Sequence, residues 1–188
     1  MDTTDELVIE LSKNKIVLLI VGSCAFVALG VWLSVDAESI VPESPIKDPL
    51  FVRGAGLAGI IFFGFCGVYG IKKLFDKRPG LVLNSSGIID NSSAIAAGFI
   101  PWSEILGAEI FQIYRQKMLI IKVRDPEMYI ARGSALKRLL NRANHKMCGS
   151  PIAITSNSLK IAFPELLSTF EQYHQKFGQS LSLGHHSE

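Results

Sequence analysis

The sequence predicts an α+β protein in which a two-helix transmembrane hairpin is followed by a small antiparallel β-barrel or sandwich with a C-terminal amphipathic helix. Two observations predict the hairpin: two long apolar runs lie before residue 72, and a basic cluster follows the second run directly. A third observation predicts the β domain. Beyond residue 79 the apolar residues fall into short alternating segments separated by polar turns, which is typical of strands.

Both apolar runs are long enough to cross a bilayer. Residues 16–35 contain no charged side chain, and residues 50–71 contain only Arg53, near one end. As a helix the second run would be about 33 Å long, against a hydrocarbon core of roughly 30 Å. The connector at residues 36–49 contains three prolines, which prevent either helix from continuing through it. We therefore expect a helical hairpin with a short extracytoplasmic loop.

The positive charges predict the orientation of the hairpin. Lys13 and Lys15 precede the first run, and Lys47 and Arg53 lie around the connector. A basic collar at residues 72–78 follows the second run. Its cations are Lys72, Lys73, Lys77 and Arg78. Because positive charge marks the cytoplasmic end of a span, both termini are predicted to be cytoplasmic.

The first run also allows a second interpretation, a cleaved secretory signal. Lys13 and Lys15 precede it, and Val35 and Ala37 match the −3 and −1 positions of a cleavage site. However, the run is longer than the usual length of roughly 7–15 residues, and the segment before it is acidic. The mass of the mature protein distinguishes the two interpretations.

Residues 79–178 are predicted to form the cytoplasmic β domain, preceded by a cytoplasmic lead at residues 1–15 with a helical turn or two. Residues 179–188 are predicted to be a disordered tail. The strongest strand pair is expected between residues 105–114 and 117–123, where apolar and basic side chains alternate. Other short strands are expected at residues 81–83, 88–89, 98–102, 151–155 and 159–162, with another short strand or extension at Tyr129 and Ile130.

Two amphipathic helices are predicted in the domain. The first covers residues 134–144, within an insertion at about residues 127–150, and the second runs from Pro164 to Gly178. Helical spacing places the apolar residues of the first helix on one face, with its basic residues outside. These apolar residues are Leu136, Leu139, Leu140 and Ala143.

Glycines in the second run predict a helix-packing face. Those near one face are Gly56, Gly59, Gly67 and Gly70. Small residues allow helices to approach closely in lipid. The face could receive the first helix, around Gly22, Ala25 and Ala28, or the same face of a second copy of the chain.

The sequence shows no catalytic or metal-binding pattern. His145 and Cys148 have a metal-like spacing, but they lack further ligands and an orienting group. Trp102 and Glu104 fit a structural role at a strand end. The three cysteines cannot pair completely, which fits a reducing compartment. We expect no enzyme activity, cofactor or metal.

Basic residues are candidate contacts to anionic lipid, to which each well-placed Lys or Arg contributes about 1 kcal/mol. The candidates are Lys72, Lys73, Lys77 and Arg78 in the collar and Arg132, Lys137, Arg138 and Arg142 in the domain. An acidic patch on a partner protein, or solvent alone, could equally face the basic helix, which also includes Lys146. The charge is too scattered to predict nucleic-acid binding.

Two segments carry a resemblance to a known group of proteins. They are Ile100-Pro101-Trp102-Ser103-Glu104-Ile105 and Leu119-Ile120-Ile121-Lys122-Val123-Arg124-Asp125-Pro126. With the two predicted spans, the chain resembles small uncharacterised bacterial inner-membrane proteins that carry a pleckstrin-homology-like (PH-like) domain. The resemblance implies a multi-pass protein of the bacterial inner (plasma) membrane. It implies no known activity, and a PH-like fold alone does not imply phosphoinositide binding.

We therefore expect a two-span integral membrane protein that tethers a PH-like binding or scaffolding domain at the cytoplasmic membrane face. Its expected partners are the lipid bilayer and either another protein or a second copy of the chain, and not nucleic acid. The alternative is an accessory subunit of a membrane transport or channel complex. No ionisable residue lies near the middle of either span, so no ion pathway is expected within them.

Overall fold

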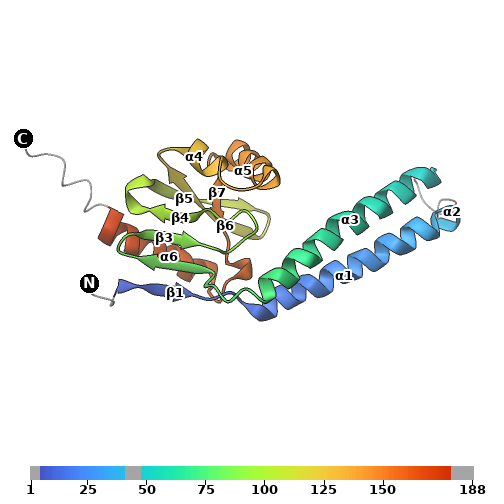
Figure 1. Ribbon diagram of the computed structural model, residues 1–188, viewed down its shortest axis with the longest axis horizontal. Helices are drawn as coiled ribbons and strands as arrows, with labels where there is room; N and C mark the ends of the chain where they lie inside the picture. Colours follow the sequence, from blue (N-terminus) through green and yellow to red (C-terminus); the bar gives the residue numbers. More distant parts are fainter. Residues whose placement is uncertain (1–4, 41–47, 179–188) are drawn as a thin grey trace, which may run out of the picture. The chain divides into compact units, whose positions relative to one another are not determined.

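The structure is a computed structural model that describes residues 5–40 and 48–178, which form two compact units (Figure 1). The hairpin is Lys13–Lys77. The β domain combines the segment before Lys13 with the segment after Lys77. The chain therefore starts in the β domain, leaves it for the hairpin and then returns.

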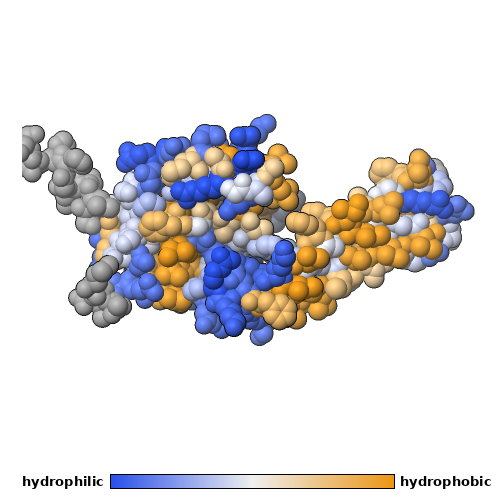
Figure 2. Space-filling view, viewed as in Figure 1, coloured by the Kyte–Doolittle hydropathy of each residue, from blue (hydrophilic) through white to orange (hydrophobic). Residues whose placement is uncertain are grey.

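The hairpin consists of α1 (Lys13–Val35), the short α2 (Ala37–Ile40) and α3 (Pro49–Leu74). Asp48 caps α3, because its side chain accepts a hydrogen bond from the Leu50 backbone N–H at 2.9 Å. Both α1 and α3 are long and apolar enough to cross a membrane. Few of their side chains are buried, and Figure 2 shows the resulting apolar surface. A core helix of a soluble protein would instead be largely buried.

The first sheet of the β domain contains β1 (Leu7–Ile9), β2 (Leu81–Asn84), β3 (Gly87–Asp90) and β4 (Gly98–Pro101), paired antiparallel in that order. Residues 7–9 do not form the helical turn predicted within residues 1–15, because β1 pairs with β2 in the register Leu7↔Leu83 to Ile9↔Leu81. This pairing satisfies the β1 backbone and buries Ile9 and Leu11. The segment before the hairpin is therefore an edge strand of the domain that follows it.

The second sheet contains β5 (Ile105–Ile113), β6 (Gln116–Val123) and β7 (Ile152–Ile154), also antiparallel and in that order. The predicted pairing of residues 105–114 with 117–123 is confirmed. The strand predicted at residues 159–162 is wrong, because Leu159 makes only an isolated bridge with Leu11. The strands in the described part of the chain form two separate sheets and no closed barrel.

The β domain also contains α4 (Pro126–Ile130), α5 (Ala135–Cys148) and α6 (Phe163–Tyr173), with a π-helical end at His174–Gly178. Short 3-10 helices lie at Trp102–Glu104 and Ser156–Ser158. The strand or extension predicted at Tyr129 and Ile130 is wrong. Asp125 starts a helix there, because its side chain accepts a hydrogen bond from the Met128 backbone N–H at 3.1 Å.

Trp102 is one of the largest fully buried side chains of the domain core. Its indole N–H donates to the Asn84 carbonyl at 2.8 Å, and its ring centroid lies 6.1 Å from that of Phe170 on α6. Both sheets supply other core side chains. The largest fully buried ones include Leu81, Leu83, Ile88, Ile100, Leu119, Ile120, Ile121, Ile154 and Leu159. Trp102 therefore joins the first sheet to the C-terminal helix and serves a structural role.

Candidate membrane-facing surfaces

The closest approach of α1 and α3 lies at Gly56. A Cβ atom at this position would lie 2.6 Å from the Gly30 backbone oxygen and would also meet Ser34. Gly59, one turn further along α3, faces open space with nothing within 4 Å. Gly22 on α1 is equally open. The two helices therefore need glycine at position 56 but not at position 59.

The contact continues along the hairpin at Gly67 and Gly70. A Cβ atom at Gly70 would lie 2.8 Å from a side-chain carbon of Ile20, whereas one at Gly67 would make an ordinary contact with Ser23 at 3.6 Å. The Ser23 hydroxyl donates to the Leu19 carbonyl at 2.9 Å. The hydroxyl is therefore satisfied within its own helix.

The base of the hairpin is held by polar contacts that the sequence did not reveal. The Lys13 ammonium donates to the backbone oxygens of Leu74 at 2.6 Å and Asp76 at 2.8 Å. It lies at the C-terminal end of α3, where the negative end of the helix dipole favours a cation. Lys73 is only 7% exposed and pairs with Asp76 at 3.1 Å. Among the predicted lipid contacts of the collar, the exposed side chains are Lys72, Lys77 and Arg78.

Two of the four candidate cations in the β domain contact β4 or the loop before it. Arg132 donates to the Phe99 carbonyl at 3.2 Å and lies 4.3 Å from the centroid of the Tyr129 ring. Lys137 donates to the Ala96 carbonyl at 2.6 Å. The other two candidates, Arg138 and Arg142, are exposed on α5.

Helix α5 faces the domain with its polar side. Asn141 is 2% exposed, and Cys148 is also buried. By contrast, Leu139 is 65% exposed and Met147 is 54% exposed. All of the apolar residues predicted for one face of this helix are exposed, and Met147 extends the same stripe: Leu136, Leu139, Leu140, Ala143 and Met147. The predicted outward placement of the basic residues is confirmed for Arg138 and Arg142, whereas Lys137 is half-buried and the apolar face also lies outside.

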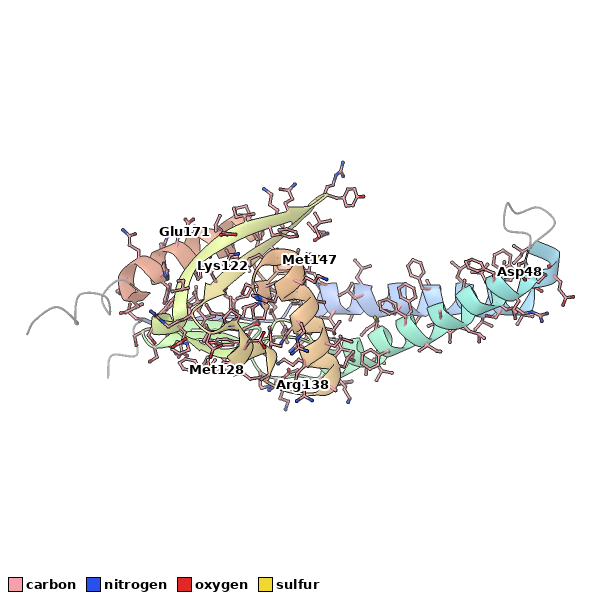
Figure 3. The ribbon with its side chains drawn as sticks, turned by 90° about the horizontal axis from the view of Figure 1, so that it is seen from above. Asp48, Lys122, Met128, Arg138, Met147 and Glu171 are labelled. Atoms are coloured by element: carbon pink, nitrogen blue, oxygen red, sulfur yellow. The ribbon has the colours of Figure 1, made fainter. Side chains whose placement is uncertain are left out.

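Tertiary contacts explain this orientation. Lys137, near the start of α5, is hydrogen-bonded to the loop before β4. At the other end, Lys122 of β6 donates to the Cys148 carbonyl at 3.3 Å. These bonds fix the rotation of the helix about its axis. Figure 3 labels Lys122, and it labels Arg138 and Met147 near the two ends of α5.

Tyr129 of α4 is a buried phenol whose hydroxyl has no hydrogen-bond partner among the described residues. Burial raises the pKa of Tyr129 above its usual value of 10.0, Arg132 opposes this shift, and Glu104 and Asp125 add to it. A raised pKa means that the folded protein keeps this proton when the unfolded chain has lost it. Folding stability is therefore expected to fall as the pH rises above about 10.

We expect Tyr129→Phe to remove part of this loss at high pH. At neutral pH the variant should be as stable as the wild type or more stable by about 1 kcal/mol, because an unpaired buried hydroxyl costs about 1–3 kcal/mol. Denaturant unfolding of the purified chain at neutral and high pH measures both effects. Tyr114→Phe is the matched control, since Tyr114 is 94% exposed. A destabilised Tyr129→Phe variant would indicate a missing partner for the hydroxyl.

His145 and Cys148 lie near the end of α5. The Nδ1 atom of His145 is buried without a partner among the described residues. Burial raises the pKa of the Cys148 thiol, and the charge of Lys122 partly opposes this shift. The raised pKa keeps the thiol protonated near neutral pH. In the described part of the chain no three His, Cys, Asp or Glu side chains are grouped to hold a metal ion. The predicted tail at residues 179–188 lies outside the described residues, as does much of the predicted connector.

No protein-family model, no curated protein and no solved structure matches this chain. The structure therefore assigns the chain to a structural class only. The described residues form an α+β protein with a helical hairpin, which has two candidate membrane spans, and two antiparallel sheets with a C-terminal helix.

Proposed function

We propose that this chain is a two-span integral membrane protein that tethers a PH-like binding domain at the cytoplasmic face of the bacterial plasma membrane. The pairing of β1 with β2 carries the proposal, because the hairpin is inserted between these two neighbouring strands. Both ends of the hairpin therefore connect to one domain, which requires an even number of crossings. Cleavage after Ala37 would remove β1, so the pairing also supports retention of α1.

The arrangement of strands supports the PH-like part of the proposal. Four antiparallel strands are followed by three more and then by a C-terminal helix, which is the order of a PH domain. Residues 124–151, which include α4 and α5, lie between β6 and β7 as an insertion. We assign binding rather than catalysis to the domain because tethering raises its effective concentration for ligands at the membrane.

The orientation is tested with single cysteines in a chain whose native cysteines have been replaced. We expect a membrane-impermeant maleimide to label Leu50→Cys, at the start of α3, in spheroplasts. It should label Tyr114→Cys, at the β5–β6 turn, only after lysis. Both positions are highly exposed, so both should react in the lysed sample. Labelling of Tyr114→Cys before lysis would overturn the cytoplasmic placement, and a chain that stays in the supernatant after ultracentrifugation would overturn the membrane assignment.

A second candidate function is that of an accessory subunit in a membrane transport or channel complex. The open glycines of the hairpin favour it, because Gly22, Gly54, Gly59 and Gly64 have no neighbouring atoms within 4 Å of an added Cβ. Small residues on the outer surface would let a helix of another protein approach closely. Cross-linking in native membranes followed by mass spectrometry tests this function. A stoichiometric complex with polytopic proteins would favour the subunit over the tether.

A further inference from the structure

Helix α5 combines an exposed apolar stripe with a buried polar side. The stripe is defined by Leu136, Leu139, Leu140, Ala143 and Met147. An amphipathic helix of a soluble domain normally buries such a stripe against the core. Contiguous exposed apolar surface instead marks a site of interaction with another surface. The stripe of α5 therefore contributes little to the core of its own domain and is available to bind.

Charges beside the stripe indicate the chemistry of the surface that it binds. Arg138, Arg142 and Lys146 are exposed on α5, and the helix contains no Asp or Glu. A helix with an apolar face and a basic polar face is typical of segments that lie in the interface of a membrane. An anionic bilayer offers both hydrocarbon for the stripe and negative headgroups for the cations.

A second copy of the chain complements this surface poorly. In a two-fold dimer the same patch meets itself, so the cations of one α5 would approach those of the other. The helix supplies no carboxylate to offset that repulsion. Charge complementarity therefore favours an anionic lipid surface over self-association.

We propose that α5 lies in the interface of an anionic bilayer, with its apolar stripe among the acyl chains and Arg138, Arg142 and Lys146 at the headgroups. The proposal rests on the proposed function, since the hairpin would keep the β domain beside the bilayer. The tether makes binding by α5 an intramolecular event, so a helix of 14 residues with weak intrinsic affinity is sufficient. Docking of α5 would fix which side of the β domain faces the cytoplasm.

The full chain in nanodiscs tests this proposal. An environment-sensitive fluorophore is attached to single cysteines placed in turn along α5, in a chain whose native cysteines have been replaced. The discs contain either phosphatidylcholine alone or phosphatidylcholine with phosphatidylglycerol. With phosphatidylglycerol present, we expect blue-shifted emission and several-fold weaker quenching by iodide at position 139 than at position 142. Tyr114→Cys is the control position and should remain accessible in both discs.

Two sets of variants separate the contribution of the apolar stripe to membrane binding from that of the cations. Leu139→Gln with Leu140→Gln should restore iodide quenching at position 136 without unfolding the domain, because both side chains are exposed. Arg138→Glu with Arg142→Glu should abolish the difference between the two lipid compositions. Far-UV circular dichroism verifies that each variant is folded.

Other results would overturn the proposal. Equal quenching at positions 139 and 142 would show that the stripe does not insert, and equal protection in both discs would exclude the role of anionic lipid. Protection that appears only with two chains per disc would assign the stripe to a second copy. In all three cases the chain remains in the discs. Failure to enter discs at all would instead overturn the proposed function.

Discussion

Deletion of residues 1–12 is expected to unfold the β domain, although every later residue of the domain remains in the chain. The deletion removes β1 and with it Ile9 and Leu11, which are 5% and 3% exposed. Full burial of such side chains contributes about 1.5–3 kcal/mol each, so roughly 3–6 kcal/mol would be lost. Small domains have a total stability of about 5–15 kcal/mol. Circular dichroism and thermal unfolding of the purified chain measure this loss.

A chain in which β1 is fused directly to the rest of the β domain should restore the stability that the deletion removes. The Ile9 carbonyl accepts a hydrogen bond from the Gly80 N–H at 2.9 Å, so the end of β1 lies beside the start of β2. Joining residues 5–12 to residues 78–178 through a short Gly-Ser linker should therefore give a folded domain without the hairpin. The fragment 78–178 alone should be unfolded or far less stable. Equal stability of the fragment and the fused chain would show that β1 is dispensable.

Gly56→Ile is expected to separate α1 from α3, because its Cβ atom would meet the Gly30 backbone oxygen at 2.6 Å. Overpacking costs about 1–3 kcal/mol. The upper end of that range is expected here, since a backbone carbonyl cannot rotate away. Phe26 and Phe63, whose ring centroids lie 4.3 Å apart, report on the contact when both are replaced by cysteine. We expect oxidative cross-linking of that pair to be fast in the parent chain and slow in the Gly56→Ile variant.

Gly59→Ile is the control on the same helix, because a Cβ atom there meets nothing within 4 Å. It should cross-link as fast as the parent chain, and Gly67→Ile should fall between the two. If all three variants cross-link at the same rate, glycine does not determine the packing of this hairpin. Slow cross-linking in Gly59→Ile alone would place the packing face on the other side of α3.

Patterns within short stretches of sequence predicted much of this protein. The two apolar runs correspond to α1 and α3, and the alternation in residues 105–123 corresponds to the β5–β6 pair. These elements depend on hydropathy and on contacts between near neighbours in the chain, which the sequence displays directly. Asp125-Pro126 predicted the end of β6, but not that the same two residues start α4.

The candidate surfaces were predictable by composition and not by orientation. Sequence spacing identified α5 as an amphipathic helix with basic residues, and four glycines as a face of the second span. Spacing does not show which side of a helix meets its neighbour. Lys73 pairs with Asp76, only three residues further on, but its burial depends on the folded chain. The partner of Lys137, the Ala96 carbonyl, lies 41 residues away in the sequence, so only the fold brings the two together.

The sequence by itself determined that this chain has two helices of membrane length and a β-rich remainder, because length and apolar content are local properties. Only the tertiary structure decided that residues 7–9 complete the sheet that begins after the hairpin, and that α5 turns its apolar stripe outward. Both outcomes depend on contacts between distant segments. Strand pairing joins residues more than seventy positions apart, and hydrogen bonds from Lys122 and Lys137 set the rotation of α5.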